Sequence, residues 1–184
     1  MKIENLEIPD VKLITLDTFH DSRGFFVERF NEKKFSNLGV NLTWVQDNFS
    51  NSIPGVIRGL HYQFELPQTK LVSCTSGEIY DVAVDIRKGS KTYGQHVGVT
   101  LSASIPQCLL VPAGFAHGFC VTSKTPADVS YKVNALYSAD GEGGIRWDDS
   151  QLAIRWPVSS FIVSNKDLEL QSFNQYDQNP KFSV

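Results

Sequence analysis

Positive charge, long apolar runs and cysteine are all scarce in this sequence. Seventeen Lys and Arg against 20 Asp and Glu give a formal net charge of −3, which argues against a general nucleic-acid surface but permits a local pocket for one anionic ligand. Nowhere do eighteen uncharged apolar residues follow one another, and residues 1–5 have no apolar run behind their charges. We therefore expect a cytoplasmic protein that is not bound to a membrane.

Cysteine is too sparse to suggest a disulfide framework or a metal cluster. Cys74, Cys108 and Cys120 are odd in number, have no C-x-x-C spacing and stand in apolar, strand-like surroundings. We interpret them as reduced, buried thiols.

Helical periodicity is rare, and a period of two dominates. In residues 79–86, Val82, Val84 and Ile86 alternate with Asp81, Ala83 and Asp85, as on a β-strand. Similar runs predict strands at residues 11–16, 25–30, 44–48, 56–62, 70–75, 96–101, 108–111, 118–122 and 129–136. Glycine- and proline-containing turns separate these runs, which favours a sandwich or barrel.

Only two short helices are expected. Residues 31–38 have Asn31 as N-cap and Gly39 at the position favoured for glycine after a helix, and residues 166–171 form the second candidate. Residues 179–184 have the composition of a tail. No repeat or linker divides the sequence, so we expect residues 1–184 to form a single antiparallel β domain.

The segment from Gly55 to Gln63, with Lys70 shortly after it, has the composition of an active site. His61 can exchange a proton near neutral pH, Arg58 can bind phosphate oxygens, and a desolvated Lys70 can stabilise an oxyanion. Each residue alone fits an exposed loop, but the three together favour a site.

A series of motifs in order along nearly the whole chain resembles the dTDP-4-dehydrorhamnose 3,5-epimerase family. The motifs are Arg23-Gly24-x-Phe26-x-Glu28, Gln46-x-Asn48-x-Ser50, Arg58-Gly59-Leu60-His61-Tyr62-Gln63, Lys70-Leu71-Val72, Gly77-x-Ile79-x-Asp81-Val82-x-Val84-Asp85-Ile86-Arg87, Pro112-x-Gly114-Phe115-Ala116-His117-Gly118-Phe119, Tyr131-Lys132, Trp156-Pro157 and Ser164-x-Lys166-Asp167. The resemblance implies an all-β, cupin-like antiparallel jelly roll with a few short helices. It also implies a homodimer in which the partner subunit lends part of the nucleotide site.

The implied substrate is dTDP-4-dehydro-6-deoxy-D-glucose, whose C4 ketone acidifies the hydrogens on C3 and C5. The resemblance assigns His61 as the base, Asp167 as the carboxylate that orients it, Lys70 as the enolate stabiliser and Tyr131 as the acid. No cofactor is implied, because the reaction only moves protons. From the residues alone, Asp167 could equally cap the short helix, and Tyr131 could be a packing residue.

One motif departs from the family, which commonly has paired tyrosines a few residues after the Tyr-Lys step. This chain has Ala135-Leu136-Tyr137 instead, so Tyr137 is the one tyrosine left there, and the resemblance places it among the catalytic residues with Tyr131. The intervals from His61 to Lys70 and from His117 to Tyr131 also differ in length from the usual ones. These departures leave open whether C3 and C5 are both inverted.

For the nucleotide-sugar, the resemblance implies contacts from residues in several motifs: Arg23, Phe26, Glu28, Gln46, Asn48, Arg58, His117, Glu142 and Lys166. Strict alternation places Arg58 and His61 on opposite faces of one strand, so Gly59 marks a β-bulge if both face the ligand. Alternatively, Arg58 has a structural role. A separate alternative applies to His117, which stands before Gly118 and could be a turn residue instead of facing the ligand.

Two other classes of protein share this strand pattern. Metal-dependent cupins usually offer H-x-H on one strand, but Gln63 stands two residues after His61, which leaves His61 and His117 as at most two ligands. A non-enzymatic sugar-binding cupin would not need His61 or the tyrosines. The sequence therefore predicts a metal-free 3,5-epimerase of the dTDP-rhamnose route to surface polysaccharide such as O-antigen, with a C3-only epimerase as the alternative.

Overall fold

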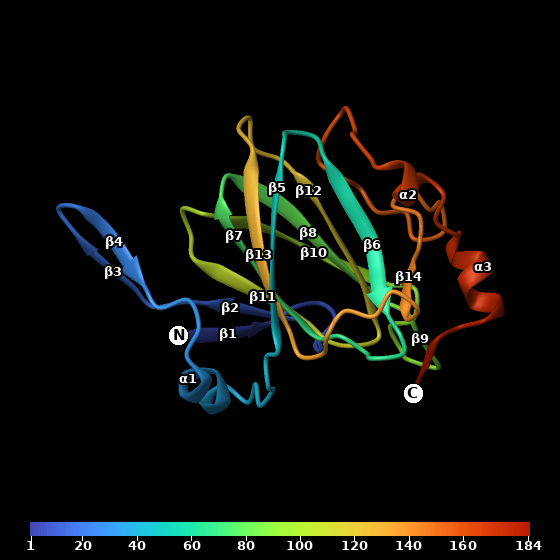
Figure 1. Cartoon of the computed structure of the whole chain (residues 1–184), viewed down its shortest axis with the longest axis horizontal. Coiled ribbons are helices and arrows are strands. Elements are labelled where there is room, and N and C mark those ends of the chain that lie inside the picture. Colours follow the sequence, from blue (N-terminus) through green and yellow to red (C-terminus); the bar gives the residue numbers. More distant parts are fainter.

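A computed structural model, which describes residues 1–184, consists mainly of two packed antiparallel sheets (Figure 1). The six-stranded sheet has, in spatial order, β1 (Lys2–Asn5), β2 (Lys12–Thr15), β11 (Gln107–Val111), β7 (Lys70–Ser76), β13 (Ala127–Val133) and β5 (Gln46–Ser52). The five-stranded sheet has β10 (His96–Ser102), β8 (Glu78–Asp85), β12 (Phe115–Val121), β6 (Ile57–Gln63) and β14 (Glu142–Gly144). The predicted antiparallel sandwich is confirmed.

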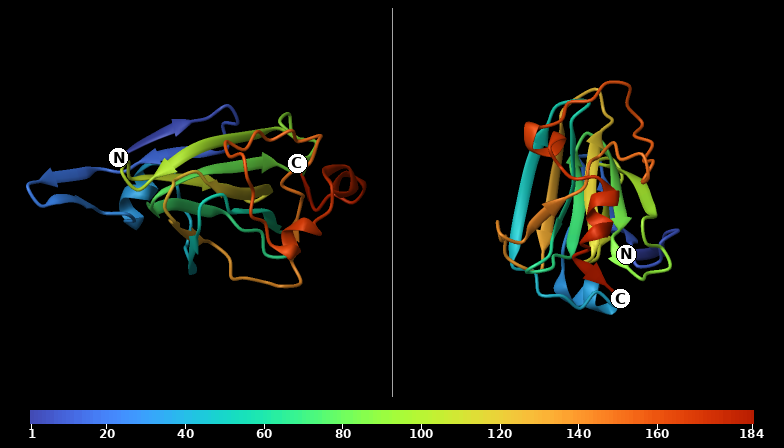
Figure 2. Two further views of the ribbon diagram at one scale, coloured as in Figure 1. Left: turned by 90° about the horizontal axis from the view of Figure 1, so that it is seen from above. Right: turned by 90° about the vertical axis from the view of Figure 1, so that its right-hand side faces the viewer.

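The smaller elements lie at the margins of this sandwich. The hairpin of β3 (Thr18–Asp21) and β4 (Gly24–Val27) projects away from the two sheets in both Figure 1 and Figure 2. The strands β9 (Arg87–Lys88) and β15 (Phe182–Ser183) form a parallel pair, the exception to the antiparallel prediction. The three helices, α1 (Glu32–Asn37), α2 (Asn165–Leu168) and α3 (Phe173–Gln178), are all too short to cross a membrane.

Apolar side chains form three clusters, one between the sheets and one on each outer face. The inner cluster joins residues of both sheets, such as Val72 and Val129 with Ala83 and Phe119. The outer face of the five-stranded sheet is covered by the C-terminal segment, including Trp156, Phe173 and Tyr176. Helix α1 covers part of the other outer face through Phe35. Both faces of each sheet are therefore buried in part, which explains why every residue of strand β12 is buried.

Local sequence explains the helices, including one that the pattern analysis missed. The Asn31 side chain accepts a hydrogen bond from the Lys34 amide at the start of α1, as predicted, and Gly39 after the helix has φ +84°. Helix α3 begins with a reciprocal capping box between Ser172 and Gln175. That Ser-x-x-Gln signal is present in the sequence and would have predicted α3.

Several predicted boundaries were wrong where a strand pattern runs on into a loop. Strand β4 ends at Val27, β5 begins only at Gln46, and β13 ends at Val133 rather than 136. The second helix covers Asn165–Leu168, not 166–171. The predicted tail is also wrong, because Phe182 pairs with Arg87 and packs against the ring of Tyr62.

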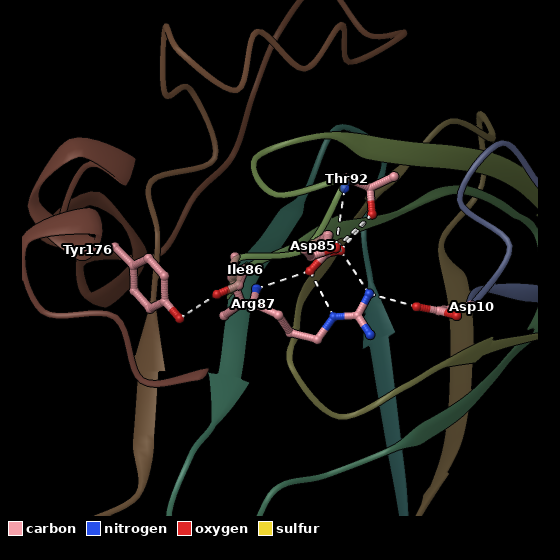
Figure 3. A network of polar contacts seen from close by, with 7 residues as sticks. Asp10, Asp85, Ile86, Arg87, Thr92 and Tyr176 are labelled. Atoms are coloured by element: carbon pink, nitrogen blue, oxygen red, sulfur yellow. Dashed lines mark hydrogen bonds and ion pairs between the residues drawn. The ribbon is translucent and has the colours of Figure 1, made fainter. Parts of the chain in front are cut away.

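A network of hydrogen bonds around the buried Asp85 connects the C-terminal segment and an N-terminal loop to the end of strand β8 (Figure 3). Asp85 is fully buried and accepts hydrogen bonds from Arg87, Ser90 and Thr92. Burial alone would raise the pKa of Asp85, but these hydrogen bonds outweigh it and lower the pKa to about 2. Arg87 also bonds Asp10 at 2.7 Å, and the Tyr176 hydroxyl donates to the Ile86 carbonyl at 2.7 Å.

Candidate active site

A cavity of about 610 Å³ opens between the two sheets, and both sheets contribute to its walls. Its lining includes Arg58, His61, His117 and Phe119 from the five-stranded sheet, and Phe49, Lys70 and Tyr131 from the six-stranded sheet. The C-terminal segment adds Lys166 and Asp167. A second cavity of about 290 Å³ shares His61, Lys70 and Tyr131 with the first. These three residues therefore stand where the two cavities meet.

Helix α2 brings Asp167 to His61 across 106 positions of sequence. The Ser164 side chain caps this helix by accepting from the Asp167 amide at 3.1 Å, so the Asp167 carboxylate is not needed as the cap. Instead, Oδ1 of Asp167 accepts from Nε2 of His61 at 2.7 Å, and Oδ2 accepts from the Gly59 amide at 3.2 Å. This pairing places the imidazole proton on Nε2 and leaves Nδ1 as the basic nitrogen.

The charge state of Asp167 suits this arrangement. Burial would raise its pKa, but the hydrogen bond and charge of His61, helped by the Gly59 amide, lower the pKa below its ordinary value. The carboxylate is therefore ionised at neutral pH and can stabilise an imidazolium at His61.

Strand β6 has the bulge that the sequence predicted. The pairing of β6 with β12 shifts register between His117 and Phe119, opposite Gly59, so Arg58 and His61 line the same cavity. Gly59 has φ +122°, and a Cβ there would lie 2.6 Å from the Gly118 Cα. Both the backbone angle and the close approach therefore require glycine at this position.

Lys70 extends from β7 toward His61. Its Nζ donates to the His61 carbonyl at 3.4 Å. Burial lowers the pKa of the Lys70 ammonium to about 8, although the charges of Asp81 and Glu142 partly oppose this change. The side chain is thus a desolvated cation at neutral pH.

The two tyrosines occupy different places. Tyr131 on β13 lines both cavities, and burial raises the pKa of its hydroxyl. Tyr137 lies on the loop between β13 and β14, lines only the smaller cavity, and has 56% of its surface exposed. Its hydroxyl donates to Oε2 of Glu142 at 3.0 Å, and Lys166 donates to the same oxygen at 2.7 Å. The hydrogen bond to Glu142 raises the pKa of Tyr137.

His117 belongs to a second histidine–carboxylate pair that sequence reasoning did not find. It lies on β12 directly opposite His61, and its Nε2 donates to Oδ1 of Asp81 at 2.5 Å. Asp81 is fully buried, and His117 is a buried strand residue rather than a turn residue. The period-two pattern had placed Asp81 on the polar face of its strand, but that face points into the sandwich.

The remaining predicted ligand residues fall into two groups. Gln46 and Asn48 line the smaller cavity with Glu142, and their amide groups are hydrogen-bonded to each other at 2.8 Å. Arg58 is held by the Ser52 hydroxyl at 3.0 Å and the Asn51 carbonyl at 3.3 Å, with its side chain at the larger cavity.

The other group lies outside both cavities of this chain. Arg23 stands at the turn of the β3–β4 hairpin, where it bonds Asp21 at 2.6 Å, and Phe26 is 67% exposed on β4. Glu28 follows β4 and pairs with Lys34 at 3.0 Å. The structure does not bring these three side chains to the His61 cavity within one subunit.

The cysteines and histidines show no metal-binding cluster. Cys74, Cys108 and Cys120 are free and buried, as predicted. No group of three or more His, Cys, Asp or Glu side chains is placed to hold a metal ion. The absence of a cofactor from the reaction stays a prediction.

Comparisons with known proteins cover almost the whole chain. The model of the dTDP-4-dehydrorhamnose 3,5-epimerase family matches residues 5–175. The dTDP-4-dehydrorhamnose 3,5-epimerase of Shigella flexneri is 50% identical over 96% of this chain and 98% of its own length. The dTDP-4-dehydrorhamnose 3-epimerase of Streptomyces niveus is 35% identical over 91% of this chain and 81% of its own length.

A solved structure shows the same fold. The dTDP-6-deoxy-D-glucose-3,5-epimerase of Legionella pneumophila, in complex with dTDP-4-keto-L-rhamnose, superposes with a TM-score of 0.95 and 44% identity, covering 100% of this chain and 98% of that one. The sandwich described above is thus the cupin-like jelly roll. With a family model matching most of the chain and relatives at this identity, the chain belongs to the dTDP-4-dehydrorhamnose 3,5-epimerase family of isomerases.

Proposed function

We propose that this enzyme inverts C3 and C5 of dTDP-4-dehydro-6-deoxy-D-glucose to give dTDP-4-dehydro-L-rhamnose. The observation that carries the proposal is the placement of a base and an acid on opposite walls of one cavity. His61 comes from the five-stranded sheet and Tyr131 from the six-stranded sheet. A ring held between them would lose a proton to one face and gain a proton on the other, which inverts the carbon.

In the first step, Nδ1 of His61 takes the proton from a carbon next to the C4 ketone. The C–H electron pair forms the enolate double bond, and the carbonyl pair moves to the C4 oxygen. The Lys70 ammonium stabilises this oxyanion in a desolvated setting. Oδ1 of Asp167 accepts a hydrogen bond from Nε2–H at 2.7 Å and stabilises the imidazolium that forms.

In the second step, the Tyr131 hydroxyl gives its proton to the same carbon from the opposite face, and the enolate returns to the ketone. Burial raises the pKa of Tyr131, so the hydroxyl carries its proton at neutral pH. The tyrosinate takes a proton from solvent, and His61 releases one, before the next carbon reacts. Tyr137 with Glu142 forms a wall at the side of the sugar ring.

For the nucleotide end, the cationic groups at the larger cavity fit a diphosphate. Arg58 presents a guanidinium there, and Lys166 lines the same cavity. We assign Gln46 and Asn48 to polar contacts with the sugar, and His117 to the ligand-facing wall. A homodimer would add Arg23, Phe26 and Glu28 from the projecting hairpin of a second copy. We place this activity in the cytoplasm and assign it to one domain, residues 1–184.

The test is the reaction of dTDP-4-dehydro-6-deoxy-D-glucose in deuterated water, with the ketone reduced before NMR analysis. We expect deuterium and inversion at both C3 and C5. Label at neither carbon would overturn the proposal. Label and inversion confined to C3 would instead favour a 3-epimerase, the activity named for the Streptomyces niveus relative.

A further inference from the structure

The loop that carries Tyr137 is held by glutamine side chains rather than by regular structure. Each of its four residues 135–138 gives one backbone group to a glutamine. The Ala135 carbonyl accepts from Gln68 (2.9 Å), the Leu136 carbonyl from Gln63 (3.0 Å), while the Tyr137 amide donates to Gln46 (2.9 Å) and the Ser138 amide to Gln63 (2.9 Å). These bonds satisfy peptide groups that have no strand partner.

Gln63 has the central position among the three glutamines. It is buried, with 5% of its surface exposed, and lies on β6 two residues after His61. Its amide nitrogen also donates to the Leu66 carbonyl at 2.7 Å, so both ends of the amide are bonded. Gln63 bonds the peptide groups on both sides of Tyr137. It therefore links the position of Tyr137 to β6, the strand that carries His61.

The Tyr137 side chain has little else to fix it. More than half of its surface is exposed, and its one side-chain hydrogen bond goes to Glu142. A side chain with so few contacts takes its position from its backbone. At the smaller cavity, that position determines how closely the tyrosine approaches the space bounded by His61, Lys70 and Tyr131.

We propose that Gln63 is a positioning residue, which holds Tyr137 as a fixed wall and thereby aligns the sugar carbons with the base and the acid. The inference rests on the proposed function, since it concerns the alignment of that substrate. A displacement of about 1 Å in a residue that positions the substrate is enough to slow the reaction strongly. Gln63 acts on rate and on the choice of carbon, not on nucleotide binding.

The test replaces Gln63 by Met, which keeps the length of the side chain but removes its hydrogen bonds. We expect kcat to fall about 10- to 100-fold, dTDP affinity to stay within about twofold, and the ratio of deuterium at C3 to C5 to change. The amides of Tyr137 and Ser138 should exchange faster. Gln107→Met is the matched control, because Gln107 bonds only Thr15 on the other sheet and should leave all four measurements unchanged.

A double-mutant cycle with Tyr137→Ala separates positioning from general damage. If Gln63 acts through Tyr137, adding Gln63→Met to Tyr137→Ala should lower kcat by less than about twofold more. Independent, multiplying losses would overturn the inference, as would an unchanged kcat and label ratio in Gln63→Met. If Gln63→Met fails to fold, Gln63→Glu, which keeps the acceptor but loses both donated bonds, takes its place.

The failure of the proposed function would look different. In that case the parent enzyme itself would label neither carbon. Amide exchange then still decides the structural part of the inference: faster exchange at Tyr137 and Ser138 supports the role of Gln63, and unchanged exchange overturns it.

Discussion

At the scale of single residues, the candidate site contains two histidines that each have a buried carboxylate partner. His61 on β6 pairs with Asp167, and His117 on the neighbouring strand β12 pairs with Asp81. They differ in access, because about a third of the His61 side chain is exposed against 9% for His117. That difference favours His61 as the residue that meets substrate and His117 as a fixed part of the wall.

Replacing His61 by Asn removes the titratable group while keeping much of the side chain's size. We expect kcat to fall about 10²- to 10⁴-fold, the range for loss of a general base, with dTDP binding and the melting temperature little changed. Steady-state kinetics and calorimetry measure this. His96→Asn, outside both cavities on β10, is the control. Turnover within a few-fold of the parent would assign the base elsewhere.

Lys70 should give the enzyme an alkaline limit. With a pKa of about 8 in the folded chain, the ammonium loses its proton as pH rises through that value, and the enolate loses its stabilising charge. We expect kcat to fall above about pH 8 in a profile from about pH 6 to pH 10. Lys70→Arg, whose guanidinium stays charged throughout, should lose this limb from whatever activity it keeps.

Loss of the Lys70 proton has the opposite effect on the stability of the fold. The ordinary pKa of 10.5 is retained in the unfolded chain, so between about pH 8 and 10.5 the unfolded state binds more protons at this site. The Lys70 contribution to the free energy of unfolding therefore rises with pH while activity falls.

The pH profile of kcat decides the catalytic part of this prediction. A kcat that stays flat to pH 9 would argue that the Lys70 ammonium is not required for catalysis.

Sequence motifs could identify the individual residues but not all of their partners. His61, Lys70 and Tyr131 were found because their motifs are local, and all three meet at the two cavities. Asp81 was missed because alternation of apolar and polar residues in a strand normally indicates one buried face and one solvent-facing face. Both faces of β8 are buried here, and only tertiary packing reveals that.

At the scale of elements, the critical feature is the bulge in β6. Without it, alternation would send Arg58 and His61 to opposite faces. The sequence could predict this irregularity, because glycine stands between two residues that both have ligand chemistry. It could not predict the register shift against β12 or the contact with Gly118, which are properties of the strand pair.

Gly59→Ala should therefore destabilise the fold. The new Cβ would meet the Gly118 Cα at 2.6 Å and the His117 carbonyl at 2.7 Å, in a backbone with φ +122°. We expect a loss of about 3 kcal/mol or more in the free energy of unfolding, measured by urea denaturation. Gly24→Ala is the matched control: φ is +132°, but nothing lies within 4 Å of the new atom, so about 1 kcal/mol of strain is expected. Equal losses would show that backbone angle, not crowding, governs the cost.

Strands were predicted better than their ends, although short strands such as β1, β3 and β14 were missed, as was helix α3. The period of two survives wherever one face packs, but it runs on into loops such as residues 134–136, where the carbonyls of Ala135 and Leu136 accept hydrogen bonds from glutamine side chains instead of from a strand. Helix α3 has only six residues, too few for a helical period to be visible. Its capping box was the available signal.

At the scale of the whole molecule, the projecting hairpin is the part least explained by a single chain. Phe19, Phe25 and Phe26 are all exposed on it, and Arg23 stands in the turn between its two strands. Exposed aromatic side chains on a protruding element are typical of a surface that contacts another protein. A second copy of this chain is the partner that the proposed dimer supplies.

Subunit complementation tests this arrangement. An Arg23→Ala, Phe26→Ala variant has an intact His61, and His61→Asn has an intact hairpin. Mixed after dissociation and reassociation, equal amounts should recover about a quarter of the parent activity, since half of the dimers are mixed and one site in each is complete. Activity no greater than the mean of the two separate variants would show that each subunit uses its own hairpin or none.

The pairing of His61 with Asp167 also bears on the order in which the enzyme is made. One partner belongs to the first half of the chain and the other lies 106 residues later, close to the end. During synthesis, His61 can be oriented only after Asp167 has left the ribosome, and the five-stranded sheet is covered only after residues such as Trp156, Phe173 and Tyr176 have done so. A chain that ends before Asp167 thus has the wall of the cavity that β6 supplies but lacks the carboxylate that orients His61.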